Sequence, residues 1–314
     1  MTASSGKSSF SAPVRVCLSG EDLDWLGYRC CCVAINRRTT ISLTDDQSSH
    51  RSLYFDRTWE LMIKRLGVSH TEIRPNLRVT TDAPIASGLA SSTALTTALV
   101  KVCLDLIGYK LRNCIELAEI VYEIERSISN CGGMDPLAIT LGGVIFIEGR
   151  RSTLPELLGR TNWPEEFGLV LIDSGQPKST ATHILDVHKQ LESDNQDLFD
   201  YIRIVDGCSE QIWRALNERD IVALCEAVNT AHIAMRDLQR MSTESLESLR
   251  DIALQNGCLG VKLTGAGHGG CLVGITHESE LNQVVRKMIR AQQQFFDGSS
   301  VNVIKAHNEQ IDYA

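Results

Sequence analysis

The chain has 314 residues, of which 43% are hydrophobic and 22% charged, an ordinary globular composition long enough for two domains of roughly 150 residues each. Its net charge of −8 argues against general nucleic-acid binding, which needs clustered Lys and Arg. No apolar run approaches the roughly 18 residues that a membrane helix requires. We therefore expect neither nucleic acid nor a membrane as a partner.

The cysteine pattern indicates a reducing compartment. There are eleven cysteines, an odd number, and the run Cys30–Cys32 is too compact for a disulfide framework. No pair of C-x-x-C motifs with histidine partners predicts a zinc site. The first 13 residues contain one Lys and no apolar core, so they do not predict a secretory signal. We expect a disordered leader followed by a cytoplasmic protein with buried thiols.

The first half of the chain alternates strand-like and helix-like stretches. Apolar residues at helical spacing predict one helix after Ser92, which Gly108 ends, and a second helix over residues 114–128. Short runs rich in Val, Ile and Thr predict strands, at residues 14–19, 31–35, 39–43, 77–81 and 144–147.

Prolines and paired charges interrupt this pattern between residues 150 and 166. A domain boundary is expected there, which divides the chain into residues 1–160 and 161–314. The second half predicts a strand at 169–172, three or four helical segments between 180 and 256, strands at 260–263 and 271–275, a helix at 278–294 and a strand at 301–306. Strands and helices mix without strict β-α-β alternation, so the predicted fold class is α+β.

Two glycine motifs resemble nucleotide signatures but lack the required context. Gly6-Lys7-Ser8 matches the end of a P-loop without the earlier glycine or a preceding strand. Gly265 to Gly270 fits G-x-G-x-x-G, but this stretch lies between two predicted strands, whereas the dinucleotide fingerprint opens a helix. A Rossmann dehydrogenase is therefore not favoured.

The stretch APIASGLASSTAL, residues 83–95, joins a glycine-containing turn to a predicted helix. Glycine lets backbone N–H groups approach a ligand closely, and a helix N-terminus carries partial positive charge. Together these features favour an anion site, and phosphate is the usual anion. A serine N-cap after a tight turn would explain the same residues, so this segment alone leaves both interpretations open.

Three other segments carry polar residues at the ends of predicted elements. The first strand ends in Glu21, Asp22 and Asp24, whose carboxylates could accept hydrogen bonds from ligand hydroxyls or form an exposed acidic turn. Glu125 ends a helix and precedes a Gly-Gly turn that carries Asp135. The glycine-rich turn after Leu263 is the last of them.

In this order the segments resemble the GHMP kinases, named for galactokinase, homoserine kinase, mevalonate kinase and phosphomevalonate kinase, with the sugar-kinase branch most similar. The resemblance extends from Arg15 to about residue 275. It implies an N-terminal domain like the second domain of ribosomal protein S5. It also implies a C-terminal ferredoxin-like domain, with ATP bound between the two.

The resemblance implies a role for each segment. Asp135 would face the attacking hydroxyl with Arg15 as its basic partner, and Ser92 (or Ser91) would ligate Mg²⁺ with Glu125. The ATP phosphates would be held by Pro84, Ser87, Gly88, Leu89, Ala90, Ser91, Ser92 and Thr93, with Gly265, Ala266 and Gly267 packed close by. The acceptor would contact Glu21, Asp22, Asp24, Gly133, Asp135 and His268.

These roles agree with the chemistry of the residues. A hydroxyl and a carboxylate suit Mg²⁺ when phosphate oxygens and waters complete its shell. An Asp beside an Arg stays ionised and can take or orient a proton from an alcohol. Two alternatives remain open here, namely that Asp135 caps a turn and that Arg15 is a surface charge at a strand edge.

The chain departs from the family pattern where Val14, Asp22 and Ala90 stand in place of the usual Gly, His and often Gly. The methyl group of Ala90 is expected to fit if that residue has a negative φ. Gly88→Val is expected to weaken MgATP use without unfolding the protein. The adenine pocket is expected between residues 36 and 59.

The three acids favour a sugar or an amino sugar as the acceptor, because they offer lone pairs to several O–H or N–H donors. They would repel an anion such as mevalonate unless Lys178 or Arg37 compensated. The alternatives are a mevalonate- or homoserine-type kinase and a catalytically silent ligand-binding regulator of the same fold. The oligomeric state is expected to be a monomer or a homodimer.

Overall fold

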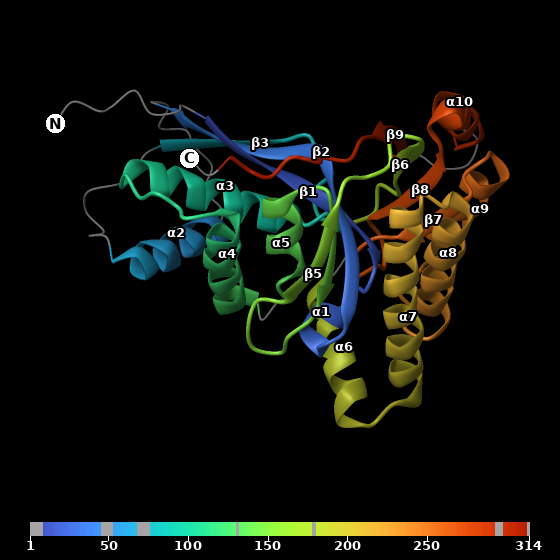
Figure 1. Cartoon of the computed structure of the whole chain (residues 1–314), viewed down its shortest axis with the longest axis horizontal. Coiled ribbons are helices and arrows are strands. Elements are labelled where there is room, and N and C mark those ends of the chain that lie inside the picture. The colour runs from blue at the N-terminus through green and yellow to red at the C-terminus, as the bar shows by residue number, and fades with distance from the viewer. Residues whose placement is uncertain are drawn as a thin grey trace.

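Two antiparallel sheets, one from each half of the chain, organise the computed structural model (Figure 1). The structure describes residues 9–44, 53–67, 76–129, 132–177, 180–292 and 298–312. Helices and strands mix without regular β-α-β alternation, which confirms the predicted α+β class.

The first sheet is built around one long strand, β2. The strand order is β1-β2-β4-β5, and β3 also pairs with β2. The two strands predicted at 31–35 and 39–43 are one continuous strand, β2. The register of the pairing between β1 and β2 shifts after Pro13, which has no N–H to donate. The bounds are β1 (Ser9–Ser19), β2 (Arg29–Thr44), β3 (Asn76–Thr81), β4 (Val144–Glu148) and β5 (Glu156–Thr161).

Two segments of this sheet differ from the sequence expectations. Residues 9–13 were expected in a disordered leader, but they begin β1 and pair with residues 38–42 of β2; residues 1–8 lie outside the described part of the chain. Residues 156–161, expected in an interrupted linker, form β5 at the sheet edge. Neither stretch has a strong apolar pattern of its own, so the neighbouring strand determines its structure.

The helices α2 to α5 lie together on one side of this sheet, where α3 and α5 pack on β1 and β2, whereas α1 lies apart from them near α6 (Thr180–Glu192) (Figure 1). Gly108, with φ 66°, follows the end of α3 as predicted, and the helix predicted at 114–128 is α4. The helices α2 and α5 were not predicted. The bounds are α1 (Leu23–Leu26), α2 (Leu53–Leu66), α3 (Ser91–Leu106), α4 (Cys114–Ser129) and α5 (Met134–Leu141).

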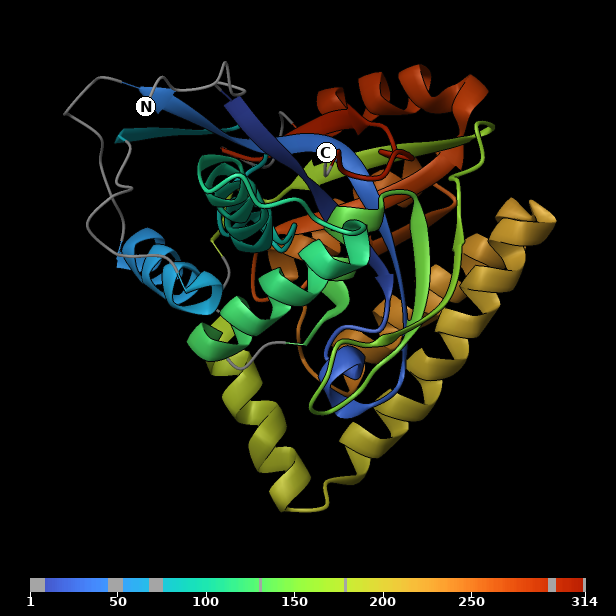
Figure 2. The same ribbon diagram turned by 60° about the vertical axis from the view of Figure 1, so that its left-hand side comes forward.

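The sheet of the second half has the strand order of a ferredoxin-like domain, with four helices in the described residues between its first two strands. Its sheet order is β7-β8-β6-β9, which is the order 2-3-1-4 of a β-α-β-β-α-β unit. The strands are β6 (Phe167–Asp173), β7 (Gly260–Leu263), β8 (Cys271–His277) and β9 (Ser300–Ile304). The helices are α6 (Thr180–Glu192), α7 (Gln196–Glu218), α8 (Ile221–Asp237), α9 (Glu244–Gln255), the short 3₁₀ helix η1 (Glu278–Glu280) and α10 (Leu281–Gln292). In Figure 2, α6 and α7 form a V that extends away from the sheets.

After β9 the chain returns to the first half of the molecule. The Asn36 N–H donates to the carbonyl of Lys305 (2.8 Å), and the His307 N–H donates to the carbonyl of Ala34 (2.8 Å). The Gly143 N–H donates to the His307 carbonyl (2.7 Å). One hydrophobic cluster includes buried residues of both sheets, and Phe146 of β4 stacks on Trp213 of α7 with ring centroids 5.5 Å apart. The two halves therefore share a core.

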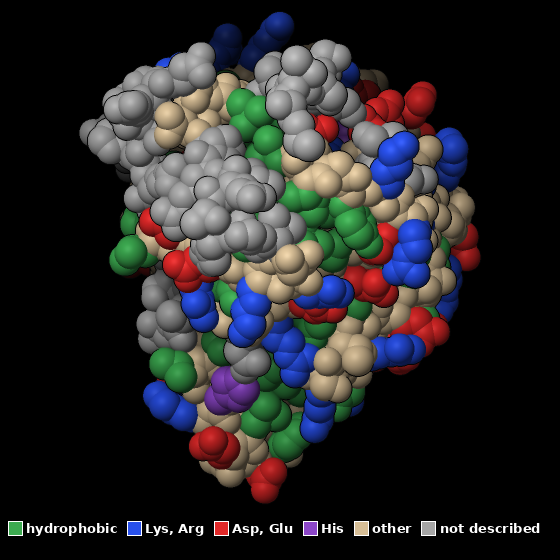
Figure 3. Space-filling view, turned by 90° about the vertical axis from the view of Figure 1, so that its left-hand side faces the viewer, with side chains coloured by type: hydrophobic (Ala, Val, Ile, Leu, Met, Phe, Trp, Pro, Cys, Tyr) green, Lys and Arg blue, Asp and Glu red, His purple; other side chains and the backbone are tan. Residues whose placement is uncertain are grey.

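The surface mixes charges of both signs. On the face shown in Figure 3, Lys and Arg side chains are interspersed with Asp and Glu. Within the described ranges, no helix is both long and apolar enough to cross a membrane. The ten cysteines that the structure describes are buried free thiols.

Candidate active site

A cavity of about 970 Å³ lies where the four motifs meet. Its wall is formed by β1, the turn around α1, the 83–95 segment, the ends of α4 and α5, the start of α6 and the glycine-rich turn after β7. Of the predicted site residues, the cavity brings together Arg15, Glu21, Asp22, Asp24, Ser87, Gly88, Ala90, Ser91, Ser92, Thr93, Glu125, Asp135, Gly265 and Ala266.

Five residues of the predicted site are absent from the cavity wall, namely Pro84, Leu89, Gly133, Gly267 and His268. Leu89 is a core residue whose carbonyl accepts a hydrogen bond from the Arg15 N–H. His268 is exposed, with φ 58°, and its N–H donates to the carbonyl of Met241. We therefore leave His268 out of the proposed acceptor site.

The segment before α3 has an unusual backbone. Ala86, Gly88 and Ala90 all have positive φ, at 54°, 91° and 57°. The condition under which the Ala90 methyl group was expected to fit, a negative φ, is therefore not met. A left-handed conformation costs a residue with a Cβ about 1–2 kcal/mol, so Ala90 stores strain in this turn.

The N-terminus of α3 favours the anion-site interpretation of this segment. The N-cap residue is Ala90, which cannot cap the helix with its side chain. The alternative explanation, a serine N-cap, is therefore wrong. The first N–H groups of a helix have no partner within the helix itself, and those of α3 begin at the cavity wall, beside Ser91 and Ser92.

The 83–95 segment and the glycine-rich turn after β7 are in direct contact. A Cβ on Gly88 would lie 2.1 Å from the carbonyl oxygen of Thr264, and a Cβ on Gly265 would lie 2.7 Å from the Gly88 Cα. The Cys271 N–H donates to the Ser87 carbonyl (2.9 Å). Gly88 is therefore needed so that two backbones can approach each other closely. This changes the expectation for Gly88→Val, because the larger side chain should also push the 83–95 segment away from the turn after β7 and destabilise the fold.

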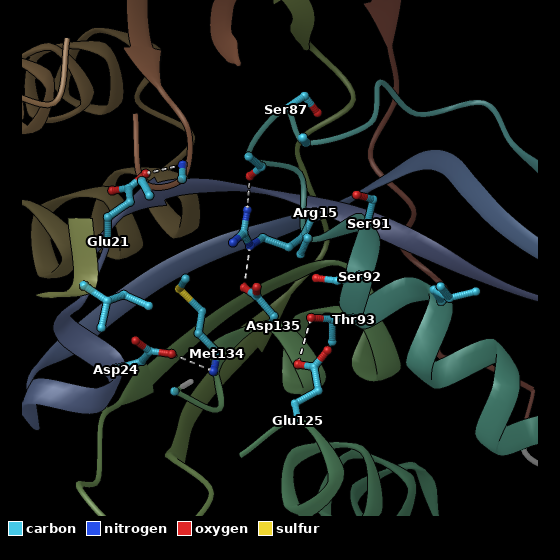
Figure 4. Close-up of a pocket in the computed structure, with 18 of the residues that line it drawn as sticks. Arg15, Glu21, Asp24, Ser87, Ser91, Ser92, Thr93, Glu125, Met134 and Asp135 are labelled. Atoms are coloured by element: carbon cyan, nitrogen blue, oxygen red, sulfur yellow. Dashed lines mark hydrogen bonds and ion pairs between the residues drawn. The ribbon is translucent and has the colours of Figure 1, made fainter. Parts of the chain in front are cut away.

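Glu125 is held in place by two threonine hydroxyls from α3. Thr93 Oγ1 donates to Glu125 Oε2 (2.9 Å), and Thr96 Oγ1 lies 3.3 Å from Oε1. Figure 4 shows the Ser92 side chain in the same part of the cavity. This hydroxyl and carboxylate fit Mg²⁺, which in a nucleotide site takes its other ligands from phosphate oxygens and waters. Thr96 was missed, although its spacing of three residues from Thr93 places both on one helix face.

Arg15 and Asp135 form an ion pair at the centre of the cavity (Figure 4). Arg15 Nε donates to Asp135 Oδ1 (2.7 Å), and Nη1 donates to the Gly88 carbonyl (2.6 Å). Burial is the largest influence on Arg15 and opposes its charge, but the attraction and hydrogen bond of Asp135, together with the nearby Cys32 and Cys17, raise the pKa of Arg15 above its ordinary value. Because Arg15 is only 4% exposed, the surface-charge alternative for it is wrong.

Asp135 lies in the first turn of α5, after the N-cap residue Gly133. Its carboxylate bonds to Arg15, and the N-cap of α5 carries no side-chain hydrogen bond. The alternative that Asp135 serves as a turn cap is therefore not what the geometry shows. The ion pair leaves the Asp135 side chain 26% exposed, so it stays accessible from the cavity.

The three acids after β1 differ in their surroundings. Glu21 is 3% exposed, and its Oε1 accepts from Lys262 Nζ (2.5 Å) and from the Gly265 N–H (3.2 Å). Its Oε2 has no hydrogen-bond partner among the described residues. Lys262, which is fully buried, was missed; a lysine within the apolar strand Gly260–Leu263 is the signal that could have indicated it.

Asp22 and Asp24 also accept hydrogen bonds from the protein. Asp22 Oδ2 lies 2.6 Å from His183 Nε2, and Asp22 Oδ1 accepts from Trp25 Nε1 (3.3 Å). Asp24 accepts from the N–H groups of Trp25 (2.9 Å) and Met134 (3.1 Å). Burial, and next the charge of Asp135, raises the pKa of Asp24 to about 7. The expectation of three freely available carboxylates is therefore wrong for Glu21 and Asp22.

The remaining cavity wall is apolar and was mostly missed by sequence reasoning. Of the described residues in the predicted adenine stretch, 36–44 and 53–59, only Thr39 lines the cavity. Val79, Ile85 and Leu95 form the wall near it. Lys178, one of the two predicted charge partners for an acidic acceptor, lies outside the described residues, and Arg37 is not on the cavity wall.

Two domain families match this chain along most of the segments that form the cavity. The description "GHMP kinases N terminal domain" matches residues 54–143, and "GHMP kinases C terminal" matches residues 213–293. The chain belongs to the GHMP kinase family. A third description, "Galactokinase galactose-binding signature", matches residues 3–44 of this family member.

Curated relatives of this GHMP family member include two kinds of kinase. A mevalonate kinase from Pyrococcus horikoshii is 28% identical over 220 residues, which cover 68% of this chain and 60% of that protein. A galactokinase from Actinobacillus succinogenes is 26% identical over 250 residues, covering 67% of this chain and 63% of that protein. The chain thus spans less than two thirds of either relative. A mevalonate kinase from Methanothermobacter thermautotrophicus is 24% identical over 85% of this chain and 89% of its own.

Solved structures confirm the GHMP fold over nearly the whole chain. The mevalonate kinase of Methanococcus jannaschii superposes with a TM-score of 0.78 at 19% identity, covering 98% of this chain and 100% of that one. The galactokinase of Lactococcus lactis complexed with galactose superposes with a TM-score of 0.75 at 17% identity, covering 98% and 95%. At these identities the likeness establishes the fold alone.

Proposed function

We propose that this chain is an ATP-dependent kinase that transfers the γ-phosphate of MgATP to a hydroxyl of a sugar or an amino sugar. The observation that carries the proposal is the Arg15–Asp135 pair, which lies in the same cavity as the 83–95 segment and Glu125. A carboxylate, a metal-binding pair and an anion site in one cavity are the parts that phosphoryl transfer requires.

In this proposal the ATP phosphates lie against the N-terminus of α3. Backbone N–H groups and the helix dipole favour a polyanion there, and Ser92 with Glu125 would hold Mg²⁺ beside it. When bound, this ion neutralises the charge that develops on the transferred phosphoryl group. The apolar wall of Val79, Ile85 and Leu95 would receive the adenine ring.

Asp135 is the proposed base for the acceptor. Its accessible carboxylate can take or orient the proton of a hydroxyl that attacks the γ-phosphorus. Arg15 fixes the direction of that carboxylate through the 2.7 Å bond from Nε. The second bond of Arg15, to the Gly88 carbonyl, ties the base to the phosphate-binding segment.

The charges of the acceptor end favour a neutral or cationic acceptor. Asp22, Asp24 and Asp135 line the cavity, whereas Arg15 is the cation on the described part of its wall and is already paired. Lys262 donates to Glu21 and to two carbonyls. Sugar hydroxyls or an ammonium group would find acceptor oxygens here, whereas an acceptor carboxylate would meet no unpaired cation on the described wall. The galactokinase signature over residues 3–44 supports the same choice.

A mevalonate- or homoserine-type acceptor is the second candidate, because mevalonate kinases from several archaea are among the relatives. A competition decides between them. The protein receives MgATP with neutral sugars, amino sugars, mevalonate or homoserine, and kcat/KM is compared across the panel. We expect a sugar or amino sugar to have the highest value. A tenfold advantage of mevalonate or homoserine would contradict the sugar proposal, and no stimulated turnover with any acceptor would favour a silent ligand-binding regulator.

We also infer a cytoplasmic setting and a monomer or homodimer. The ten described cysteines support the first inference, because free buried thiols suit a reducing compartment. Size-exclusion chromatography with light scattering tests the second inference, and a larger assembly would contradict it.

A further inference from the structure

The helix α6 closes the acceptor end of the cavity. Ile184 and Leu185 of this helix line the cavity wall. Leu185 is 60% exposed, an unusual degree of exposure for a leucine that lines a binding cavity. Figure 2 shows that α6 extends away from the sheets, so only its first turns can reach the site.

Two side chains fasten α6 to the turn around α1. His183 Nε2 lies 2.6 Å from Asp22 Oδ2, and the His183 side chain is 4% exposed. About one and a half turns further along, the ring of His188 lies against the ring of Trp25, with centroids 5.0 Å apart. Trp25 Nε1 in turn donates to Asp22 Oδ1. Asp22 and Trp25 therefore connect α6 directly to the loop that carries Asp24.

The Asp22 side chain bonds to His183 and does not cap the short helix α1. Asp22 is the N-cap residue of α1, but its side chain makes no capping bond and its φ is 68°. Aspartate at an N-cap ordinarily accepts a bond from the first turn, and a left-handed conformation is costly for a residue with a Cβ. The carboxylate is turned toward α6 instead.

We propose that His183 is a positioning residue for the acceptor: by holding Asp22, it fixes the α1 turn and the Ile184–Leu185 wall around the acceptor. This inference rests on the proposed kinase function. His183 does not touch the reacting atoms. Its role is to fix the positions of Asp24, Trp25 and the apolar wall when the acceptor binds.

Other contacts hold the rest of α6, so loss of His183 affects the cavity end of the helix. Val187 is buried in the core formed with α7 and β6. Near the C-terminal end, the side-chain amides of Gln190 and Gln239 bond to each other (3.0 and 3.2 Å). A variant at His183 should therefore remain folded with α6 attached but with its first turns free to move.

Steady-state kinetics test the proposal with the sugar that the competition identifies. We expect His183→Ala to raise the KM of the acceptor about tenfold or more while the KM of ATP stays within about twofold. His183→Gln, whose amide can donate to Asp22 from a similar position, should recover most of the loss. The acceptor KM of the double variant His183→Ala/Asp22→Ala should be no higher than that of the more affected single variant, because each change removes the same His183–Asp22 interaction.

The control is Lys189→Ala, on the outer side of the same helix, which should leave both KM values unchanged. Lys189 is exposed and bonds only to Asp186 among the contacts described. An unchanged acceptor KM in His183→Ala would overturn the proposal, as would strictly additive losses in the double variant. Equal losses in every kinetic constant would also overturn it, since they would indicate a general structural role.

Hydrogen exchange separates this inference from the kinase proposal, because it needs no acceptor. Amides in the first turns of α6 should exchange faster in His183→Ala than in the wild type, while those of α3 and α8 should not change. Unchanged exchange in α6 would overturn the proposal whichever acceptor is phosphorylated. If His183→Ala does not fold, His183→Gln and Asp22→Asn serve for the same measurement. Failure of every acceptor in the competition would instead contradict the kinase proposal and leave the exchange result to decide the role of His183.

Discussion

At the scale of single residues, the site depends on polar and charged groups that are paired inside the protein. Arg15 with Asp135, Lys262 with Glu21, and His183 with Asp22 each join residues far apart in the sequence. A buried charge that loses its partner is strongly destabilising. Each pair therefore fixes the position of a carboxylate more firmly than exposed side chains could.

Asp135→Asn tests the proposed base. We expect kcat to fall about 100-fold or more, the usual scale for a general base, while the KM of ATP changes little. The variant also removes the counter-charge of buried Arg15, so the temperature of unfolding should fall. Circular dichroism at the assay temperature must therefore show a folded protein. A normal kcat would rule out the assignment of Asp135.

Ala90→Gly tests the strain before α3. Because Ala90 has φ 57°, glycine should relieve the left-handed backbone and raise the free energy of unfolding by about 0.5–1 kcal/mol. Ala223→Gly, within the regular helix α8, is the matched control and should lower stability by about 1 kcal/mol. Urea denaturation measures both changes. Loss of stability in Ala90→Gly comparable to the control would contradict the argument.

At the scale of elements, the strand β7 shows how the glycine-rich turn is supported. One edge of β7 pairs with β8, and side chains from α8 and α9 satisfy the other edge. The Leu263 N–H donates to His232 Nδ1 (3.2 Å), the Val261 N–H donates to Asn229 Oδ1 (3.1 Å), and Arg250 Nε donates to the Val261 carbonyl (3.0 Å). The helices thus occupy backbone groups that a free sheet edge would expose.

Acid should weaken this support. Burial, and next the charge of Arg250, lowers the pKa of His232 to about 4 from an ordinary value of 6.5. Between pH 6.5 and pH 4 this histidine binds a proton in the unfolded chain but not in the folded protein. The contribution of neutral His232 to the free energy of unfolding is therefore complete above pH 6.5 and declines as the pH falls toward 4. One pKa unit corresponds to about 1.4 kcal/mol, so the loss should be on the order of 3 kcal/mol.

Thermal unfolding at pH 7, 6 and 5 checks this prediction. His232→Asn keeps an acceptor for the Leu263 N–H but cannot titrate, so its stability should change less between pH 7 and 5 than that of the wild type. His277→Asn, at an exposed position, is the control and should keep the wild-type slope. Identical slopes in all three proteins would show that His232 does not determine the acid sensitivity.

At the scale of the whole molecule, the two halves are joined by their shared core and by the segment after β9. Ile311 is buried, and its N–H donates to the carbonyl of Thr140 in α5 (2.9 Å). The Asn308 carbonyl also accepts a bond from Arg160 Nη2, a residue of the first half. The division into residues 1–160 and 161–314 remains a prediction, and the return segment shows that the first half is completed by residues from the second.

Removal of the chain after Ile304 tests this dependence. The variant loses the burial of Ile311, worth about 2 kcal/mol, and the backbone bonds to β2, so its temperature of unfolding should fall by about 5 °C or more. Calorimetry should show one transition in the wild type. Gln310→Ala, at an exposed position of the same segment, should have no effect. Two separate transitions in the wild type would contradict the shared core.

The sequence predicts the parts of the molecule that have a local pattern. The periodicity of α3 and α4 indicated two helices, and the glycines of the 83–95 segment and of the turn after Leu263 led to the prediction of a phosphate site, without any long-range information. The strand β5 could not be predicted in this way, because two leucines alone do not indicate a strand and its structure depends on pairing with β4. The pairs Lys262–Glu21 and His183–Asp22, and the sign of φ at Ala90, are products of tertiary structure.

The return segment also bears on how the chain folds during synthesis. Ala34 and Asn36 in β2 leave the ribosome long before Lys305 and His307, the residues with which they pair. At ordinary rates of translation the delay is on the order of ten seconds. During that interval the backbone of β2 at this point must remain hydrated, held by a chaperone or bonded elsewhere. The first half of the chain therefore reaches its native hydrogen bonding only once residues 305–311 have emerged from the ribosome.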